Sequence, residues 1–88
     1  MTLTLIEHNG LLAVDVPWHN RDTPEYGESV PYIELRDGLH YKRFDAKITN
    51  RSPYWKDFSK ILKIALKEMP IFRGCTSVRM PNGFILKL

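Results

Sequence analysis

Cysteine is nearly absent from this chain, since Cys75 is the only one among 88 residues. No disulfide can form within the chain, whereas secreted domains of this size usually depend on several bridges. Long apolar runs are also missing, because no uninterrupted stretch approaches the roughly 20 residues that span a bilayer. The first eight residues lack the basic start and apolar run of a signal peptide. We therefore expect a cytoplasmic protein that does not contact a membrane.

Signatures of catalysis are lacking as well. The sequence contains no glycine-rich phosphate loop, no zinc-protease histidine pair and no nucleophile elbow. No paired cysteine or histidine motif indicates a metal site, and Asp15, His19 and Asp22 lie in a region whose irregular course gives no predictable ligand geometry. We expect no catalytic residue, no metal and no cofactor, so the sequence favours a protein that is not an enzyme.

Length and composition are typical of one small globular domain, to which we assign residues 1–88. The chain is 43% hydrophobic and 26% charged, which lies within the ordinary globular range. A chain this short buries only roughly 60–65% of its unfolded surface. That leaves little room for an enclosed active site.

Asn9-Gly10 is the strongest turn signal. Both residues suit the positive φ angles of a two-residue type I′ turn between strands at 2–8 and 11–16. This turn pairs Leu5 with Val14 and gives the hairpin one apolar face. The sequence therefore predicts a first β-hairpin with its register fixed.

Asp37-Gly38 predicts a second hairpin. A three-residue loop, Arg36-Asp37-Gly38, pairs Leu35 with Leu39, whereas a two-residue loop mixes apolar and polar residues on one face. Gly38 supplies the left-handed residue that the three-residue loop requires. We therefore favour the three-residue loop.

Pro81-Asn82-Gly83 predicts a third hairpin. Proline suits the first corner of a type I turn, and the glycine suits the bulge that follows it. This loop places Met80 opposite Phe84 and Val78 opposite Leu86.

An amphipathic helix is predicted at 53–69, between the second and third hairpins. Ser52 suits the N-cap, Pro53 suits the first helical position, and Pro70 ends the helix. Eight apolar residues fall within an arc of about 140°; they are Tyr54, Trp55, Phe58, Ile61, Leu62, Ala65, Leu66 and Met69. We interpret this apolar stripe as part of the core.

The order of elements predicts an α+β fold. Its simplest form is a mostly antiparallel sheet built from three β-hairpins, with the helix packed on one face. The segment 17–29 has no periodicity, and long segments of this kind are often functional. It contains Trp18 and Tyr26, which we regard as candidate partner contacts because aromatic residues anchor interfaces.

Charge is distributed unevenly along the chain. Residues 1–38 hold seven acids and two bases, a net of −5, whereas residues 39–88 hold eleven bases and three acids, a net of +8. The total of +3 therefore hides a strong asymmetry. In the basic half, four lysines occupy about 60° of the helical wheel opposite the apolar stripe; they are Lys56, Lys60, Lys63 and Lys67. Arg51 and Lys47, with Lys42 and Arg43, extend this basic patch.

Three interpretations of function follow. The leading one is a small interaction protein, of inhibitor or adaptor type, that docks on a macromolecular partner through charged surfaces and the long loop. The second is a nucleic-acid-binding domain that uses the lysines, although a partner protein is favoured over nucleic acid. The third and least favoured is a small metal-dependent nuclease that uses Asp15 or Glu34. Equally, the lysines can be only the solvated side of the helix, and Ile64 among them leaves a homodimer contact open.

Overall fold

An antiparallel hairpin with the predicted register opens the chain. β1 (Thr2–His8) pairs with β2 (Leu11–Val14), and Leu5 lies opposite Val14. Asn9 and Gly10 have φ angles of 53° and 79°, as the type I′ turn requires. The computed structural model, which describes residues 1–15 and 31–88, therefore confirms this first hairpin.

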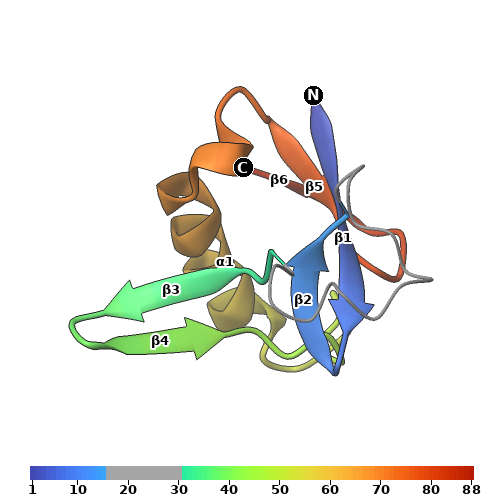
Figure 1. Ribbon diagram of the computed structural model, residues 1–88. Coiled ribbons are helices and arrows are strands. Elements are labelled where there is room, and N and C mark those ends of the chain that lie inside the picture. The colour runs from blue at the N-terminus through green and yellow to red at the C-terminus, as the bar shows by residue number, and fades with distance from the viewer. Residues whose placement is uncertain (16–30) are drawn as a thin grey trace.

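A four-stranded mixed sheet forms around this hairpin. β5 (Ser77–Arg79) and β6 (Ile85–Lys87) pair antiparallel with Val78 opposite Leu86, as predicted. The strand order is β2-β1-β5-β6, and β1 runs parallel to β5 (Figure 1). The predicted fold class α+β is confirmed, but the expectation of a sheet built from three hairpins is wrong. β3 (Glu34–Asp37) and β4 (His40–Arg43) form a separate two-stranded sheet.

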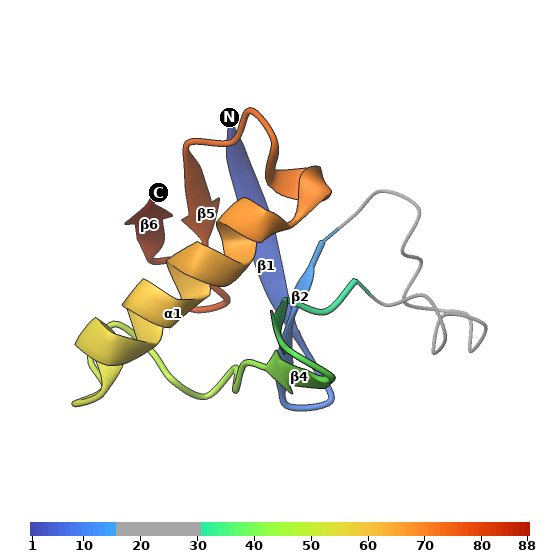
Figure 2. The same ribbon diagram turned by 90° about the vertical axis from the view of Figure 1, so that its left-hand side faces the viewer.

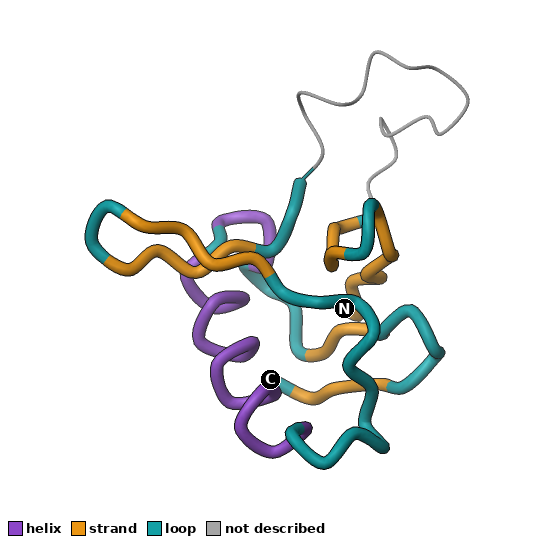
Figure 3. Tube along the Cα trace, turned by 90° about the horizontal axis from the view of Figure 1, so that it is seen from below, coloured by secondary structure: helices purple, strands orange, loops and turns teal. Residues whose placement is uncertain are grey.

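Only the base of the second hairpin pairs with the larger sheet, through backbone hydrogen bonds to the outer edge of β2. Leu12 donates its N–H to the carbonyl of Phe44 at 2.9 Å and accepts the N–H of Ile33 at 3.0 Å. Farther along β2, Val14 donates to the carbonyl of Pro31 at 2.9 Å. Beyond this base the strands leave the sheet and extend over α1 (Figure 1), and the view from below shows them projecting past the helix (Figure 3).

The register of the second hairpin differs from the predicted one. Asp37 lies opposite His40, so the loop is the two-residue Gly38-Leu39 rather than Arg36-Asp37-Gly38. Gly38 has a φ of 61° at the first central position, which is typical of a type II′ turn. The prediction assumed that apolar residues pair on a buried face. That assumption fails because all four β4 residues are exposed and Leu39 is 90% exposed at the tip.

The helix is slightly shorter than predicted. α1 spans Trp55–Glu68, and the short 3₁₀ helix η2 (Pro70–Phe72) follows it. Ser52 is not the N-cap, because its hydroxyl accepts the N–H of Thr49 at 3.0 Å and lies in the preceding turn. Among the helices in the described ranges, none is long and apolar enough to cross a bilayer.

The core lies between α1 and one face of the four-stranded sheet (Figure 2). The sheet contributes buried residues from each strand, and the base of the second hairpin adds two more; they are Leu5, Leu12, Val14, Val78, Leu86, Ile33 and Phe44. α1 contributes Leu62, Ala65 and Leu66, and other members of its apolar stripe pack at the margin. Tyr54 is the exception, because it precedes the helix and is 72% exposed.

Substitution on opposite sides of α1 tests this packing. Leu62→Ala should lower the free energy of unfolding by about 2–5 kcal/mol, because it leaves a cavity in a fully buried site. Lys60→Ala should change it by less than about 0.5 kcal/mol, because the side chain is exposed. Urea denaturation of the two variants provides the comparison, and similar losses would mean that the helix faces are misassigned.

Candidate interaction surface

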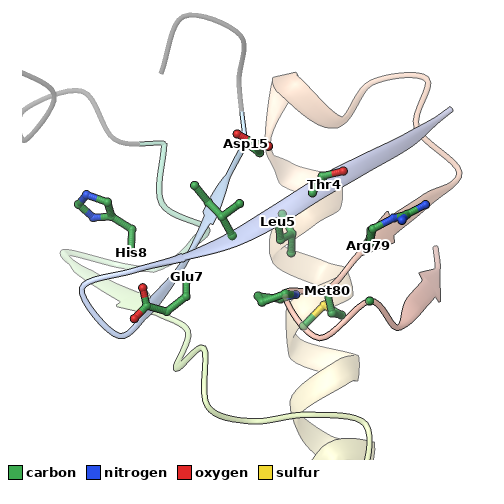
Figure 4. A pocket seen from close by; sticks show the side chains of 10 residues that line it. Thr4, Leu5, Glu7, His8, Asp15, Arg79 and Met80 are labelled. Atoms are coloured by element: carbon green, nitrogen blue, oxygen red, sulfur yellow. The ribbon is translucent and has the colours of Figure 1, made fainter. Parts of the chain in front are cut away.

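One hollow lies beside β1, near the turn between β5 and β6. It has a volume of about 520 Å³ and is lined mainly by β1 and by the chain around Met80 and Pro81. Its ionisable side chains do not converge in Figure 4, where Glu7 and Asp15 lie on opposite sides of β1 and Arg79 lies at the far end from His8. Catalytic pockets instead bring a few polar groups to one point.

Metal ligands are not gathered in the part of the chain that the structure describes. Within residues 1–15 and 31–88, no group of three or more His, Cys, Asp or Glu side chains is placed to hold a metal ion. His19 and Asp22 lie outside the described residues. Glu34, which the nuclease interpretation uses, forms an ion pair of 2.8 Å with Arg43.

A polar cluster ties the second hairpin to the turn of the first. The Tyr32 hydroxyl lies 2.6 Å from Nδ1 of His8 and accepts an N–H from Asn9 at 3.4 Å. The guanidinium of Arg43 lies 4.4 Å from the centre of the Tyr32 ring, within cation–π range. Because Arg43 also contacts Glu34, the cluster links both strands of the hairpin to the end of β1.

The four helix lysines share one solvent-facing side of α1. Lys56, Lys60 and Lys67 are exposed, while Lys63 is half-buried. None of these ammonium groups forms an ion pair or hydrogen bond with any residue of the structure as described. Two acids, Asp57 and Glu68, also lie on this 14-residue helix. The structure therefore brings together the four predicted lysines as an unpaired basic face, which we call the lysine face.

The other predicted contacts lie elsewhere. Lys47 is exposed in the connection between β4 and α1, and its backbone N–H donates to Asp45 at 2.8 Å. Arg51 lines a different shallow hollow, where Asn82 donates to Asn50 at 3.0 Å. Trp18 and Tyr26 fall outside the described residues.

A groove between β4 and α1 was not predicted from the sequence. Its first part is a hollow of about 320 Å³ lined on the helix side by Tyr54, Phe58 and Ile61, and on the strand side by the chain from Lys42 to Asp45. No residue of β3 lines this hollow, so it lies on the β4 side of the hairpin. Asp57 lies at its margin. The groove is therefore apolar inside and charged along its sides.

A second hollow continues the groove toward the tip of the hairpin. It has a volume of about 440 Å³ and shares Lys42 and Ile61 with the first hollow. Residues of both β3 and β4 line it, so it lies between the hairpin and α1, where it reaches Leu35 and Ile64. Three large side chains that line the groove remain exposed: Tyr41, Tyr54 and Ile64. Leu39 is also exposed, at the tip of the hairpin. One sequence feature indicates this groove, the apolar Ile64 on the polar side of the helix. Leu39 and Tyr54 are instead predicted on buried faces.

Comparison with known proteins adds no further assignment. No protein-family model, curated protein or solved structure matches this chain. The function is therefore inferred from the residues and their geometry alone.

Loss of one hydroxyl tests the polar cluster. Tyr32→Phe should lower the free energy of unfolding by about 0.5–1.5 kcal/mol, because the partly buried hydrogen bond to His8 and the exposed one from Asn9 are lost. Tyr41→Phe is the matched control, because the exposed Tyr41 hydroxyl has no partner in the described structure and its loss should be nearly neutral. Chemical denaturation measures both, and equal stability of the two variants would contradict a stabilising role for the cluster.

Proposed function

We propose that this chain is a small, non-enzymatic, cytoplasmic interaction protein that docks on an acidic region of a partner protein. The observation that carries the proposal is the juxtaposition of the unpaired lysine face with an exposed apolar groove. At about 100° per residue, Lys60 lies about 40° from Ile64 on the helical wheel, so the lysine face borders the groove. One partner surface can therefore contact both.

The apolar groove favours a protein partner over a nucleic acid. Protein interfaces combine a desolvated apolar centre, often with aromatic residues, and a polar rim. Tyr54, Ile61 and Ile64 supply apolar surface here, and the lysines supply the rim. Binding of phosphate backbones depends mainly on basic charge, and Asp57 and Asp45 beside the groove weaken the positive field there.

A nucleic-acid-binding domain is the second candidate, supported by the lysine face itself. Four unpaired lysines on one side of a helix suit sequence-independent phosphate contacts. Such binding weakens steeply as salt rises, because counterions are released on association. A salt titration with random duplex DNA therefore distinguishes the two candidates.

Charge reversal on the lysine face tests the proposal. Lys60→Glu/Lys67→Glu changes two exposed residues and spares the half-buried Lys63. Folding should be retained, because exposed charges contribute little to stability. Affinity capture from a native cell lysate should lose the protein that wild type retains, whether or not the lysate is treated with nuclease.

The matched control carries the same change in net charge on another surface. Arg79→Glu/Lys87→Glu alters exposed residues that alternate with the buried Val78 and Leu86, so they lie on the sheet face away from α1. This variant should capture the partner as wild type does. Equal capture by all three proteins would reduce the lysine face to a solvated surface, and loss of capture after nuclease treatment would favour the second candidate.

A further inference from the structure

β4 presents an unpaired edge beside the groove. The two-residue turn closes on the pair Asp37–His40, and hydrogen-bonded pairs alternate with non-bonded ones along an antiparallel ladder. The N–H and C=O groups of Tyr41 and Arg43 therefore point away from β3. Within the described residues, these N–H and C=O groups have no hydrogen-bond partner. The edge is also uncovered, because every β4 residue is exposed.

Such an edge can accept another strand. Extended peptides add to uncovered sheet edges through backbone hydrogen bonds, while neighbouring hollows select alternate side chains. Natural proteins protect free edges by keeping them short and placing positive charges on them. β4 has four residues and carries Lys42 and Arg43, so any added strand must be compatible with this charge.

Charge argues against a second copy of the chain as that strand. If two β4 strands pair through the outward groups of both Tyr41 and Arg43, each Tyr41 lies opposite the other chain's Arg43. Lys42 then lies directly opposite its own copy. Like charges in directly opposed positions destabilise a strand pair, whereas opposite charges stabilise it. Lys42 therefore favours an aspartate or glutamate in the added strand.

The hollows specify the residues next to that acid. Side chains two positions apart share one face of a strand, so the added residues opposite His40 and Phe44 lie on the same face as Lys42. Lys42 lines both hollows, with Phe44 in the first and His40 in the second. Ile61 is shared by both hollows, and Ile64 extends the second. Apolar side chains fit these two positions.

We infer that the partner contributes an extended segment that adds to β4 as a third strand. An acidic residue of this segment lies opposite Lys42, and apolar residues two positions to either side occupy the two hollows between the second hairpin and α1. The inference rests on the proposed function and specifies the kind of partner segment that the groove accepts.

Peptide selection on the full chain tests the specificity. A display library of random 12-residue peptides should yield sequences with Asp or Glu at one position and apolar residues two positions before and after it. Lys42→Glu should weaken the selected peptides by about tenfold or more, because an attractive cross-strand pair becomes repulsive. Failure to enrich any peptide, or enrichment of sequences without this spacing, would overturn the inference.

Backbone pairing needs a separate pair of variants. Tyr41→Pro removes one outward N–H, which an edge strand tolerates, and should weaken the selected peptides by about tenfold. Tyr41→Ala removes the same side chain but keeps the N–H, so it should retain most of the affinity. Equal binding by the two variants would overturn the added strand.

Hydrogen exchange supplies a measurement that needs no variant. The amides of Tyr41 and Arg43 should exchange rapidly in the free chain and become protected when a selected peptide binds. If protection of these two amides rises with chain concentration in the absence of peptide, the added strand comes from a second copy of the chain. That result would overturn the inference. Protection by random DNA rather than by peptide would likewise overturn the inference.

The two proposals fail in different ways. If Lys60→Glu/Lys67→Glu abolishes capture of the native partner but Tyr41→Pro captures it as well as Tyr41→Ala, the proposed function stands and the added strand is wrong. If neither substitution affects capture, both proposals are wrong.

Discussion

The two hydrogen bonds of Leu12 determine where the second hairpin leaves the sheet. Leu12 is held between Ile33 on the incoming strand and Phe44 on the outgoing strand, and all three side chains are buried. The hairpin is therefore fixed at its base by backbone pairing and packing together, while Leu39 at its tip remains in solvent. Both the groove and the free edge of β4 depend on this arrangement, because it holds two strands over α1 without joining them to the larger sheet.

This arrangement gives α1 three sides rather than two. Leu62 and Leu66 pack in the core, Ile61 lines the groove, and the lysines face solvent. A simple amphipathic helix has only the first and the last of these sides. The hairpin creates the third by covering part of the helix, so binding in the groove uses side chains that the core does not require. Changes at the lysine face can therefore alter association while leaving the fold intact.

Sequence patterns predicted what is set by neighbouring residues and missed what is set by distant ones. The register of the first hairpin was predicted correctly, because the geometry of the Asn9-Gly10 turn and the apolar pattern of Leu5 and Val14 agree. At Gly38 the pattern misled, because pairing Leu35 with Leu39 assumes a buried face that this hairpin lacks. The parallel contact of β1 with β5 left no local signal, since it joins segments about 75 residues apart. Helical spacing was enough to predict the lysine face. The groove could not be predicted in the same way, because it depends on where the second hairpin lies relative to α1.

Lys42 combines protection of the edge with selection of a partner. A positive charge at the centre of a short, uncovered strand opposes pairing with an identical strand. Protection alone does not account for the two apolar hollows that meet at Lys42, nor for Ile64, which remains 52% exposed beside them. Apolar surface next to an edge that only avoids association would favour aggregation. The combination is instead that of a selective edge, where the charge excludes like strands and the adjoining apolar hollows stabilise an oppositely charged one.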